Sequence, residues 1–318
     1  RLVIGTRSSR LALAQTSLFI DKLLLAYPDM SHDSVEICPI KTSGDQNQSI
    51  RLDQMGGKGL FAKEIETELL EETIDLAVHS MKDIPADENS ALSIGCWLER
   101  FDHRDAILCN ENIESISDLS KNSLIGTSSI RRRSQIINLR NDLSIKSLRG
   151  NVDTRINKLK EKEFDAIILS VAGLKRLSLD HLISFIFSED EILPASCQGA
   201  IGIQMKSNND DLKSFISPLN HESTEDLCTI EREVLGVIKA NCNSPIGVLA
   251  TESNNKIKLQ CEIFDHYGNN IYSNVMIESY SKKNEIGIKM GKDILSNLGQ
   301  KKIDNLDFLK NDFDYPPN

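Results

Sequence analysis

The sequence predicts an α/β protein whose sheets consist largely of parallel strands, with a small α+β unit at the end of the chain. Short apolar runs alternate with helical patterns through the first two thirds of the chain, and polar residues follow several of these runs. That alternation is typical of helices packed on the faces of a parallel sheet. At 318 residues, the chain is long enough for two or three domains.

The first part contains six β-rich runs, and a helix follows the first of them. The helical pattern of "RSSRLALAQTSLFIDKLLLAY" continues until Pro28 ends it. The expected strands are "RLVIGT", "SVEICPIKT", "DLAVHS", "SLIGT", "IKSLRG" and "DAIILS".

The last part has a different pattern, which starts near residue 220. "CTIEREVLGVIKAN" indicates a helix, and alternating strands follow in "KIKLQCEIFDHYGNNIYSNVMIES", with turns at Asn254-Asn255 and Gly268-Asn269. "EIGIKMGKDILSNLG" is an amphipathic helix that Gly299 ends. We therefore expect a separate small domain here.

The charge is unevenly distributed along the chain. The formal net charge is −10 and the pI is near 5.2, which argues against bulk binding of nucleic acid. Residues 121–176, however, hold thirteen Lys and Arg against five Asp and Glu, a local charge of +8. A basic segment within an acidic protein favours a confined anion site.

Arg131, Arg132 and Arg133 stand side by side in this segment, and taken alone they are typical of a solvated helix face. Arginines and hydroxyls recur, however, in the turns where the expected strands end. Ligands bind at the carboxyl ends of parallel strands, where helix N-termini also present N–H groups to anions. We therefore expect these arginines to converge on one cleft, with Arg131 and Arg132 as ligands and Arg133 as a solvated neighbour.

The seven cysteines are scattered, odd in number and without a CxxC pair, so neither a disulfide framework nor a zinc ribbon is indicated. A reducing compartment is the better interpretation. No apolar run is long enough to span a bilayer, and no signal peptide stands at the start. The chain begins without Met, which leaves open a leader that has been removed.

Three stretches are candidates for chemistry. "MGGKGLF" lacks the spacing of a phosphate loop, and residues 43–59 read either as a mobile lid or as a loop without function. In "HSMKDIP", Asp83 can hold a cation or accept N–H bonds, whereas His79 is expected to be a buried core residue. Cys242 in "NCNSPIG" lies in an exposed loop, where nearby cations would make it a nucleophile; the alternative is an inert thiol.

Together these stretches resemble the porphobilinogen deaminase (hydroxymethylbilane synthase) family. Nine motifs occur in order over residues 1–250, and they are "GTRSSRLALAQ", "GGKGLFAKEIE", "DLAVHSMKDIP", "RDA", "IGTSSIRRRSQ", "SLRGNVDTR", "DAIILSVAGLKRL", "LPASCQGAIGI" and "NCNSPIG". The resemblance implies a transferase of tetrapyrrole and heme biosynthesis. Such an enzyme condenses porphobilinogen head to tail, releases ammonia, and builds a linear tetrapyrrole on a covalent dipyrromethane cofactor.

The resemblance also implies roles for individual residues. Cys242 carries the cofactor through a thioether, and Asp83 is the catalytic carboxylate, with Lys82 beside it. The cofactor-binding residues are Ser80, Lys82, Asp83, Thr127, Ser129, Arg131, Arg132, Arg149 and Arg155. The substrate-binding residues are Arg7, Ser9, Arg149, Arg155 and Arg176. No metal is implied.

The implied fold has two domains like those of periplasmic binding proteins and a small C-terminal α+β domain that bears the cofactor. We place domain 1 at residues 1–99 with a return segment at 200–218, domain 2 at 100–199 and the C-terminal domain at 219–318. Cys197 in "SCQG" departs from the usual "VGQG", near the hinge, and Gln54 stands where a lysine is usual. We expect a cytoplasmic monomer, or one in an organelle stroma or matrix if a leader was removed, with neither nucleic acid nor membrane as partner. The alternative is a two-domain solute-binding or effector-binding module without catalysis.

Overall fold

The structure, a computed structural model of the chain, describes residues 1–42, 62–86, 89–240, 244–265 and 267–308. The chain forms two compact units, each composed of two segments. Unit 1 contains Arg1–Phe101 and Gly199–Asp226, and unit 2 contains Asp102–Gln198 and Leu227–Asn318. The chain therefore passes between the units three times.

Unit 1 is built on a five-stranded sheet in the order β2-β1-β3-β10-β4. β1 runs parallel to β2 and β3, whereas β10 is antiparallel to β3 and β4. Helices α1, α3 and α7 pack on the sheet. The bounds are β1 (Leu2–Arg7), α1 (Arg10–Ala26), β2 (Val35–Ile40), α3 (Lys63–Leu70), β3 (Leu76–Ser80), β4 (Leu92–Trp97), β10 (Ile201–Lys206) and α7 (Asp210–Ile216).

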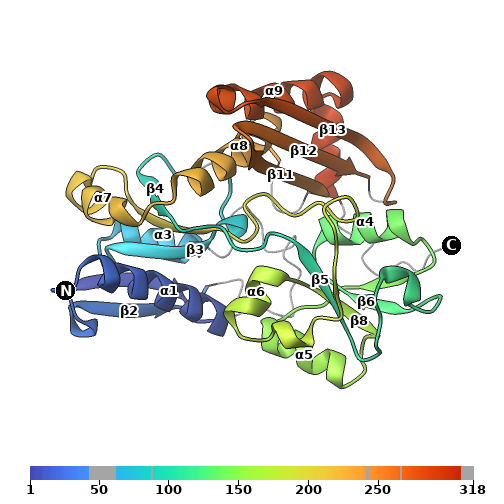
Figure 1. Cartoon of the computed structure of the whole chain (residues 1–318), viewed down its shortest axis with the longest axis horizontal. Helices are drawn as coiled ribbons and strands as arrows, with labels where there is room; N and C mark the ends of the chain where they lie inside the picture. The colour runs from blue at the N-terminus through green and yellow to red at the C-terminus, as the bar shows by residue number, and fades with distance from the viewer. Residues whose placement is uncertain (43–61, 87–88, 241–243, 266, 309–318) are drawn as a thin grey trace. The chain divides into compact units, whose positions relative to one another are not determined.

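Unit 2 repeats this plan in a sheet of the order β7-β6-β8-β5-β9. Figure 1 labels β5, β6 and β8 of this sheet. β6 runs parallel to β7 and β8, and β5 is antiparallel to β8 and β9. The bounds are β5 (Asp105–Cys109), β6 (Leu124–Gly126), α4 (Ile130–Leu139), β7 (Ser144–Lys146), α5 (Val152–Lys160), β8 (Ala166–Ser170), α6 (Val171–Arg176) and β9 (Phe185–Ile186).

A third sheet belongs to the C-terminal part of unit 2. The antiparallel strands β11 (Ile246–Ser253), β12 (Lys256–Phe264) and β13 (Asn270–Ser279) share one hydrophobic core with the helices α8 (Glu222–Ile238), α9 (Lys283–Leu298) and α10 (Gln300–Asp304). Asn254 and Asn255 have positive φ in the first turn, and Gly268 has φ 85° in the second, as their residue types predict. Gly299 ends α9 with φ 74°.

The predicted α/β class with a small C-terminal α+β part is confirmed, and each of the six expected strands is present. The patterns did not predict the antiparallel strands β5 and β10. No α-helix stands between β5 and β6, so the strand-turn-helix alternation that marks the parallel strands does not mark β5. β10 does lead into α7 after a short polar turn, and it was missed although that alternation is present.

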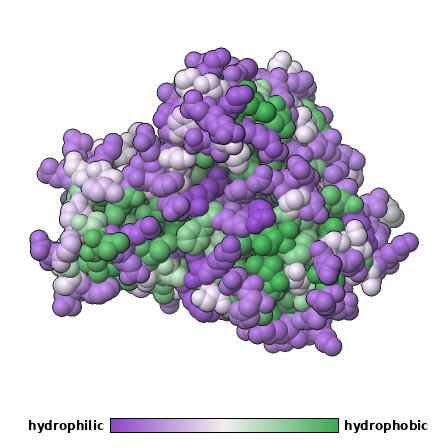
Figure 2. Space-filling model, viewed as in Figure 1, coloured by the Kyte–Doolittle hydropathy of each residue, from purple (hydrophilic) through white to green (hydrophobic). Residues whose placement is uncertain are grey.

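The face of the molecule that Figure 2 shows is mixed in character. In Figure 2, hydrophilic side chains cover much of the face shown and interrupt the hydrophobic areas. Among the described residues, no helix combines the length and the apolar character that a membrane span requires.

Candidate active-site residues

In unit 1, candidate residues gather where two neighbouring parallel strands end. β1 ends at Arg7 and β3 ends at Ser80, so both side chains stand at the carboxyl edge of the sheet. A short 3₁₀ turn, Met81–Asp83, follows β3 at once. There Nη1 of Arg7 lies 3.9 Å from Oδ2 of Asp83, and the two side chains are 25% and 33% exposed. This edge therefore carries a carboxylate and a guanidinium, both within reach of solvent.

The hydroxyls of this edge are fixed by hydrogen bonds. Ser9 caps α1, because its Oγ accepts the N–H of Ala12 at 3.2 Å. Gln15 on α1 donates to Oγ of Ser80 at 2.7 Å. The helix thereby holds the end of β3 against the end of β1, and the end of β3 leads directly into Lys82 and Asp83.

His79 is a buried core residue, as expected. Its Nε2 lies 2.9 Å from Oε1 of Gln204, the neighbouring strand's side chain. Burial lowers the pKa of His79 to about 4, although the hydrogen bond with Gln204 opposes this shift. The imidazole is therefore neutral at pH 7.

In unit 2, the turn after β6 forms the capped N-terminus of α4. Oγ1 of the buried Thr127 accepts the N–H of Ser129 at 3.1 Å, and Oγ of Ser129 accepts the N–H of Arg132 at 3.4 Å as the N-cap of α4. These bonds fix the first turn of α4 and so fix where Arg131 and Arg132 leave the helix.

The other predicted arginines of unit 2 stand at the same kind of position. Arg149 follows β7, and the next residue, Gly150, has φ 109°, a conformation that L side chains rarely adopt. Nε of Arg155 on α5 donates to the carbonyl of Gly150 at 2.8 Å. Arg176 ends α6 after β8, and burial lowers its pKa to about 10.

Arg131 and Arg132 share one buried carboxylate, that of Asp105. Oδ2 of Asp105 accepts a bond from Nη2 of Arg131 at 2.8 Å. Its Oδ1 accepts bonds from Nε and Nη2 of Arg132 at 3.1 and 2.7 Å, and from Nε2 of Gln198 at 2.8 Å. The Asp105 side chain is 0% exposed, and those of Arg131 and Arg132 are 5% and 7% exposed. The three charges form one buried group with a net charge of +1.

The charges within this group decide its protonation. Burial by itself would raise the pKa of Asp105, but the guanidinium charges of Arg131 and Arg132 and the hydrogen bonds from Arg132 and Gln198 outweigh it. They hold the pKa of Asp105 well below its usual range. Burial acts in the opposite sense on Arg131 and lowers the pKa of its guanidinium. Nε of Arg131 is buried and has no hydrogen-bond partner within the described part of the chain.

Arg133 is not the solvated neighbour that the sequence suggested. It is 7% exposed and therefore buried. Its position on α4 does point away from the direction of Arg132, but that side of the helix is covered. α4 packs against β12, and Ser134 beside it donates to the carbonyl of Asp265 at 3.5 Å. The C-terminal sheet thus occupies the space that an isolated helix would leave to water.

Asp105 is the residue that the sequence patterns missed. It opens the antiparallel strand β5 and is paired in register with Ser170, the last residue of β8. An antiparallel strand begins at the edge where its parallel neighbours end, so Asp105 lies at the edge from which Arg131 and Arg132 extend. A lone carboxylate at the start of the apolar run "DAILC" was the available signal.

The predicted residues are divided between the two units. Arg7, Ser9, Ser80, Lys82 and Asp83 belong to unit 1, and Thr127, Ser129, Arg131, Arg132, Arg149, Arg155 and Arg176 belong to unit 2. That they form one cleft stays a prediction. Cys242, Gln54 and the 43–59 loop lie outside the described residues.

Unit 1 offers the guanidinium of Arg7 beside the solvent-accessible carboxylate of Asp83, and unit 2 by itself offers guanidinium and hydroxyl donors. Guanidinium groups bind carboxylates in a bidentate manner, so the arrangement suits a ligand that carries several carboxylates. The carboxylate of Asp83 can accept N–H bonds from such a ligand or stabilise a positive charge on it.

Comparison with known proteins gives a family for this site. Residues 2–214 match the model of the porphobilinogen deaminase dipyrromethane cofactor binding domain, and residues 226–296 match the model of the C-terminal domain of the same enzyme. A porphobilinogen deaminase of Natranaerobius thermophilus is 39% identical over 307 residues, which cover 95% of this chain and 97% of that protein. A chloroplastic porphobilinogen deaminase of Oryza sativa subsp. japonica is 41% identical over 292 residues, 91% of this chain and 81% of the relative.

Among solved structures, a TRAP periplasmic solute binding protein from Desulfovibrio salexigens is similar with a TM-score of 0.41 and 12% sequence identity, over 70% of this chain and 73% of that one. The family models and the relatives favour the enzyme over the alternative of a solute-binding module without catalysis. They match both the main part of the chain and its C-terminal domain, so the resemblance in the nine motifs is confirmed. The chain belongs to the porphobilinogen deaminase family.

Proposed function

We propose that this chain joins porphobilinogen units through Asp83, while the arginines of the two units bind the carboxylates of the growing pyrrole chain. Enzymes of this family are transferases that condense porphobilinogen into hydroxymethylbilane, with a dipyrromethane cofactor as primer. The observation that carries the assignment of Asp83 is its position. It is a carboxylate at the carboxyl edge of the unit 1 sheet, 33% exposed and 3.9 Å from the guanidinium of Arg7.

The donor set of unit 2 fits the chemistry of a dipyrromethane. Each pyrrole of that group carries an acetate and a propionate, and the buried Nε of Arg131 is a donor that still lacks a described acceptor. We propose that Thr127, Ser129, Arg131, Arg132, Arg149 and Arg155 hold these carboxylates, together with Ser80 and Lys82 of unit 1. When bound, the group supplies the pyrrole carbon to which the first porphobilinogen is joined.

Asp105 sets how much positive charge the arginine pair can offer to a ligand. It neutralises one of the two guanidinium charges and orients both groups through charge-assisted hydrogen bonds. The remaining charge of +1 is available to a carboxylate. A ligand carboxylate near Arg131 would therefore complete the neutralisation of a buried charge, which favours binding in a dry site.

Asp83 acts on the incoming porphobilinogen. The aminomethyl group leaves in its protonated form: when the C–N bond of –CH2–NH3+ breaks, its electron pair stays with the nitrogen, which departs as ammonia, and the positive charge remains on the pyrrole as an azafulvene. The Asp83 carboxylate stabilises that charge and accepts a hydrogen bond from the pyrrole N–H. Lys82 lies next to it, and Arg7, Ser9 and Arg176 are proposed to bind the carboxylates of the substrate together with Arg149 and Arg155.

We further propose that Cys242 is the point of covalent attachment and that the chain works as a cytoplasmic monomer. The scattered cysteines support a reducing compartment, and the six cysteines of the described part form no disulfide. The intact mass of the active protein tests the attachment. It should exceed the sequence mass by one dipyrromethane, and peptide mapping should find the addition on the Cys242 peptide alone.

Replacement of Asp83 tests the mechanism. In Asp83→Asn the size and some hydrogen bonding remain, but the negative charge is lost. Loss of a few kcal/mol of barrier stabilisation lowers the rate roughly a hundredfold or more. Asp83→Glu keeps the charge one methylene away and should retain more activity. The measurement is ammonia release and tetrapyrrole formation from porphobilinogen, at matched cofactor occupancy.

Asp21 is an exposed carboxylate on α1, so Asp21→Asn serves as the matched control and should keep the wild-type rate. If Asp83→Asn equals or exceeds Asp83→Glu in rate, the charge at residue 83 does not drive the reaction. An unmodified Cys242 in fully active protein would show that the attachment point lies elsewhere.

A further inference from the structure

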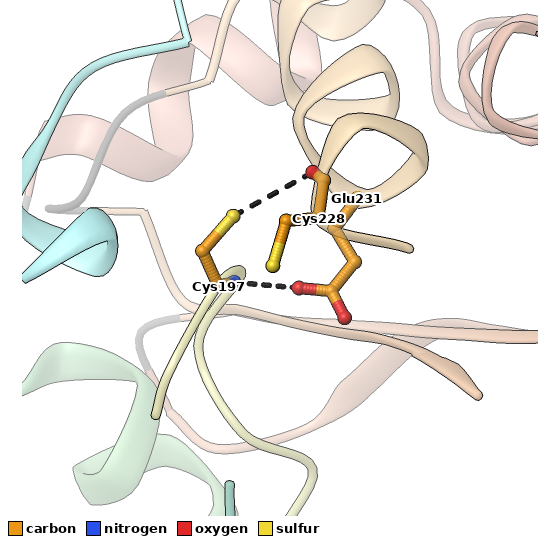
Figure 3. A group of neighbouring side chains, drawn as sticks. All are labelled: Cys197, Cys228 and Glu231. Atoms are coloured by element: carbon orange, nitrogen blue, oxygen red, sulfur yellow. Dashed lines mark hydrogen bonds between the residues drawn. The ribbon is translucent and has the colours of Figure 1, made fainter. Parts of the chain in front are cut away.

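Three side chains outside the proposed catalytic groups meet in the interior of unit 2. Cys197, Cys228 and Glu231 are all buried, and their Sγ and carboxylate oxygen atoms lie within 4.8 Å of one another. Cys197 precedes the point where the chain leaves unit 2, whereas Cys228 and Glu231 stand on α8 (Figure 3). The two thiols are therefore neighbours in space, although a whole segment of unit 1 separates them in sequence.

Glu231 fixes Cys197 in this position. One carboxylate oxygen accepts the backbone N–H of Cys197 at 2.5 Å, and the other accepts the N–H of Ala250 on β11 at 2.9 Å. Cys197 has φ 58°, a left-handed conformation that costs a side-chain-bearing residue free energy. The bond to Glu231 holds the residue there and keeps its thiol against α8.

The Cys197 thiol also contacts Cys228. Sγ of Cys197 donates to the carbonyl oxygen of Cys228 at 3.6 Å, and Figure 3 shows the Cys228 side chain between those of Cys197 and Glu231. Burial would raise the pKa of the Cys197 thiol, but a hydrogen bond from the Cys228 side chain and the charge of Arg232 act against it, and the pKa is lowered. The buried thiol of Cys96, by contrast, has its pKa raised to about 12 by burial. Among these two buried thiols, Cys197 and Cys96, the Cys197 thiol is the one that ionises more readily.

The pair is placed at two of the passages between the units. The chain enters unit 1 between Gln198 and Gly199, one residue after Cys197, and it returns to unit 2 between Asp226 and Leu227, one residue before Cys228. A bond between the two sulfur atoms would close a loop that contains the whole of Gly199–Asp226. It would also tie the start and the end of that loop together inside unit 2.

We propose that Cys197 and Cys228 form a reversible dithiol–disulfide site that is oxidised by a low-molecular-mass disulfide of the glutathione type. The Cys197 thiolate attacks one sulfur of the oxidant, forms a mixed disulfide and releases one reduced thiol, which takes up the proton. The Cys228 thiolate then attacks Sγ of Cys197, forms the internal disulfide and releases the second thiol. Two protein thiols are oxidised and one external disulfide is reduced to two thiols.

A metal site is the other chemistry that these residues suggest, and the geometry favours it less. Each carboxylate oxygen of Glu231 already accepts a hydrogen bond from a backbone N–H, and the Cys197 thiol donates a hydrogen bond to a backbone carbonyl. A tetrahedral zinc site requires thiolates and a fourth ligand. The hydrogen bonds present are those of a protonated Cys197 thiol and of a carboxylate whose two oxygens are both occupied.

The experiment uses the full-length protein with its cofactor. The reduced protein is equilibrated in buffers of increasing ratio of oxidised to reduced glutathione under nitrogen, with a chelator present, and free thiols are then trapped by alkylation. We expect a species lighter by two hydrogen atoms, and a cross-linked peptide that joins Cys197 to Cys228. The oxidised protein should melt about 5–10 °C higher, because the cross-link restricts the unfolded chain, and dithiothreitol should reverse the shift.

The control variants separate this pair from the other thiols. Cys228→Ser should stop at a glutathione adduct on Cys197, and Cys197→Ser should give no cross-link. Cys261→Ser removes another fully buried thiol of unit 2 and should still form the Cys197–Cys228 bond. These readouts are independent of porphobilinogen turnover, so they hold or fail apart from the proposed function.

Two results would overturn the proposal. One is that the thiols of Cys197 and Cys228 can still be alkylated at every ratio of oxidised to reduced glutathione. The alkylation is carried out in denaturant, where the unfolded protein reacts completely. The other is that protein prepared without chelator contains one equivalent of zinc, which both Cys197→Ser and Cys228→Ser abolish.

Discussion

Replacing Asp105 with Asn removes the carboxylate that both Arg131 and Arg132 contact. The amide keeps the shape of the side chain, but it leaves two buried guanidinium groups without a counter-charge. Asp105 accepts four hydrogen bonds in this network, three of them from the two arginines. Breaking a buried ion pair by removing one partner typically costs about 3–5 kcal/mol, and we expect Asp105→Asn to destabilise unit 2 by at least that amount.

The second step is to compare this variant with Arg131→Met. That change removes one cation and leaves the Asp105–Arg132 pair neutral, so its cost should be close to that of lost charge-assisted hydrogen bonds, about 1.5–3 kcal/mol. In the double variant the repulsion between the two guanidinium groups is absent. Its free energy of unfolding should therefore fall by less than the sum of the two single effects.

The pH dependence of the stability difference between wild type and Asp105→Asn provides an independent check. The folded pKa of Asp105 is depressed, so its contribution is present above the unfolded pKa of about 3.9 and is lost as the pH falls toward the folded pKa. The stability difference between wild type and Asp105→Asn should be constant from pH 8 to pH 5. Below about pH 4 it should shrink.

Urea unfolding followed by far-ultraviolet circular dichroism measures these differences. Trp97, the single tryptophan, lies in unit 1, so its fluorescence reports on the other unit. Surface substitutions usually change the free energy of unfolding by no more than about 0.5 kcal/mol. If the free energy of unfolding of Asp105→Asn lies that close to the wild-type value, the account of the network is refuted. A difference that persists unchanged at pH 3 would refute the role of the charge.

Three further predictions concern other parts of the chain. Arg131→Leu or Arg132→Leu should lower cofactor occupancy of the folded protein, measured by intact mass, whereas the buried Arg133→Leu should lower stability at full occupancy; equal occupancy in all three variants would contradict the assignment. His79→Gln should remove a pH dependence of unfolding. Because the folded pKa of His79 is about 4, wild type should lose about 3 kcal/mol relative to this variant as the pH falls from 6.5 to 4, and parallel pH profiles would exclude it. Gly287→Ala should lower the free energy of unfolding in urea by about 1–3 kcal/mol, because its Cβ would lie 2.6 Å from a carbonyl oxygen of α8. An unchanged transition would show that α8 and α9 can move apart without a cost in free energy.

The local sequence determined the parallel strands, the helices and the turn residues. After β1, β6, β7 and β8 a polar turn leads straight into a helix, so neighbouring residues alone specify these elements. The positive φ of Asn254 and Asn255 and the end of α9 at Gly299 depend only on residue type. The motifs gave the family for the same reason, because each is a short continuous stretch.

Only the tertiary structure decided how charges and thiols pair. Asp105 meets Arg131 and Arg132 because β5 is antiparallel to β8, which places the start of one strand beside the end of the other. Arg133 is buried because the C-terminal sheet covers α4. No local pattern specifies these contacts, since each joins segments that fold as separate elements.

The pairing of the cysteines likewise depends on the tertiary structure. Counted along the sequence, they lack paired spacing and indicate neither a disulfide framework nor a metal site. In the structure Cys197 and Cys228 face each other, because the chain leaves unit 2 beside the place where α8 returns to it. Sequence spacing fixes distance only within an element. The distance between elements depends on the packing of the whole unit.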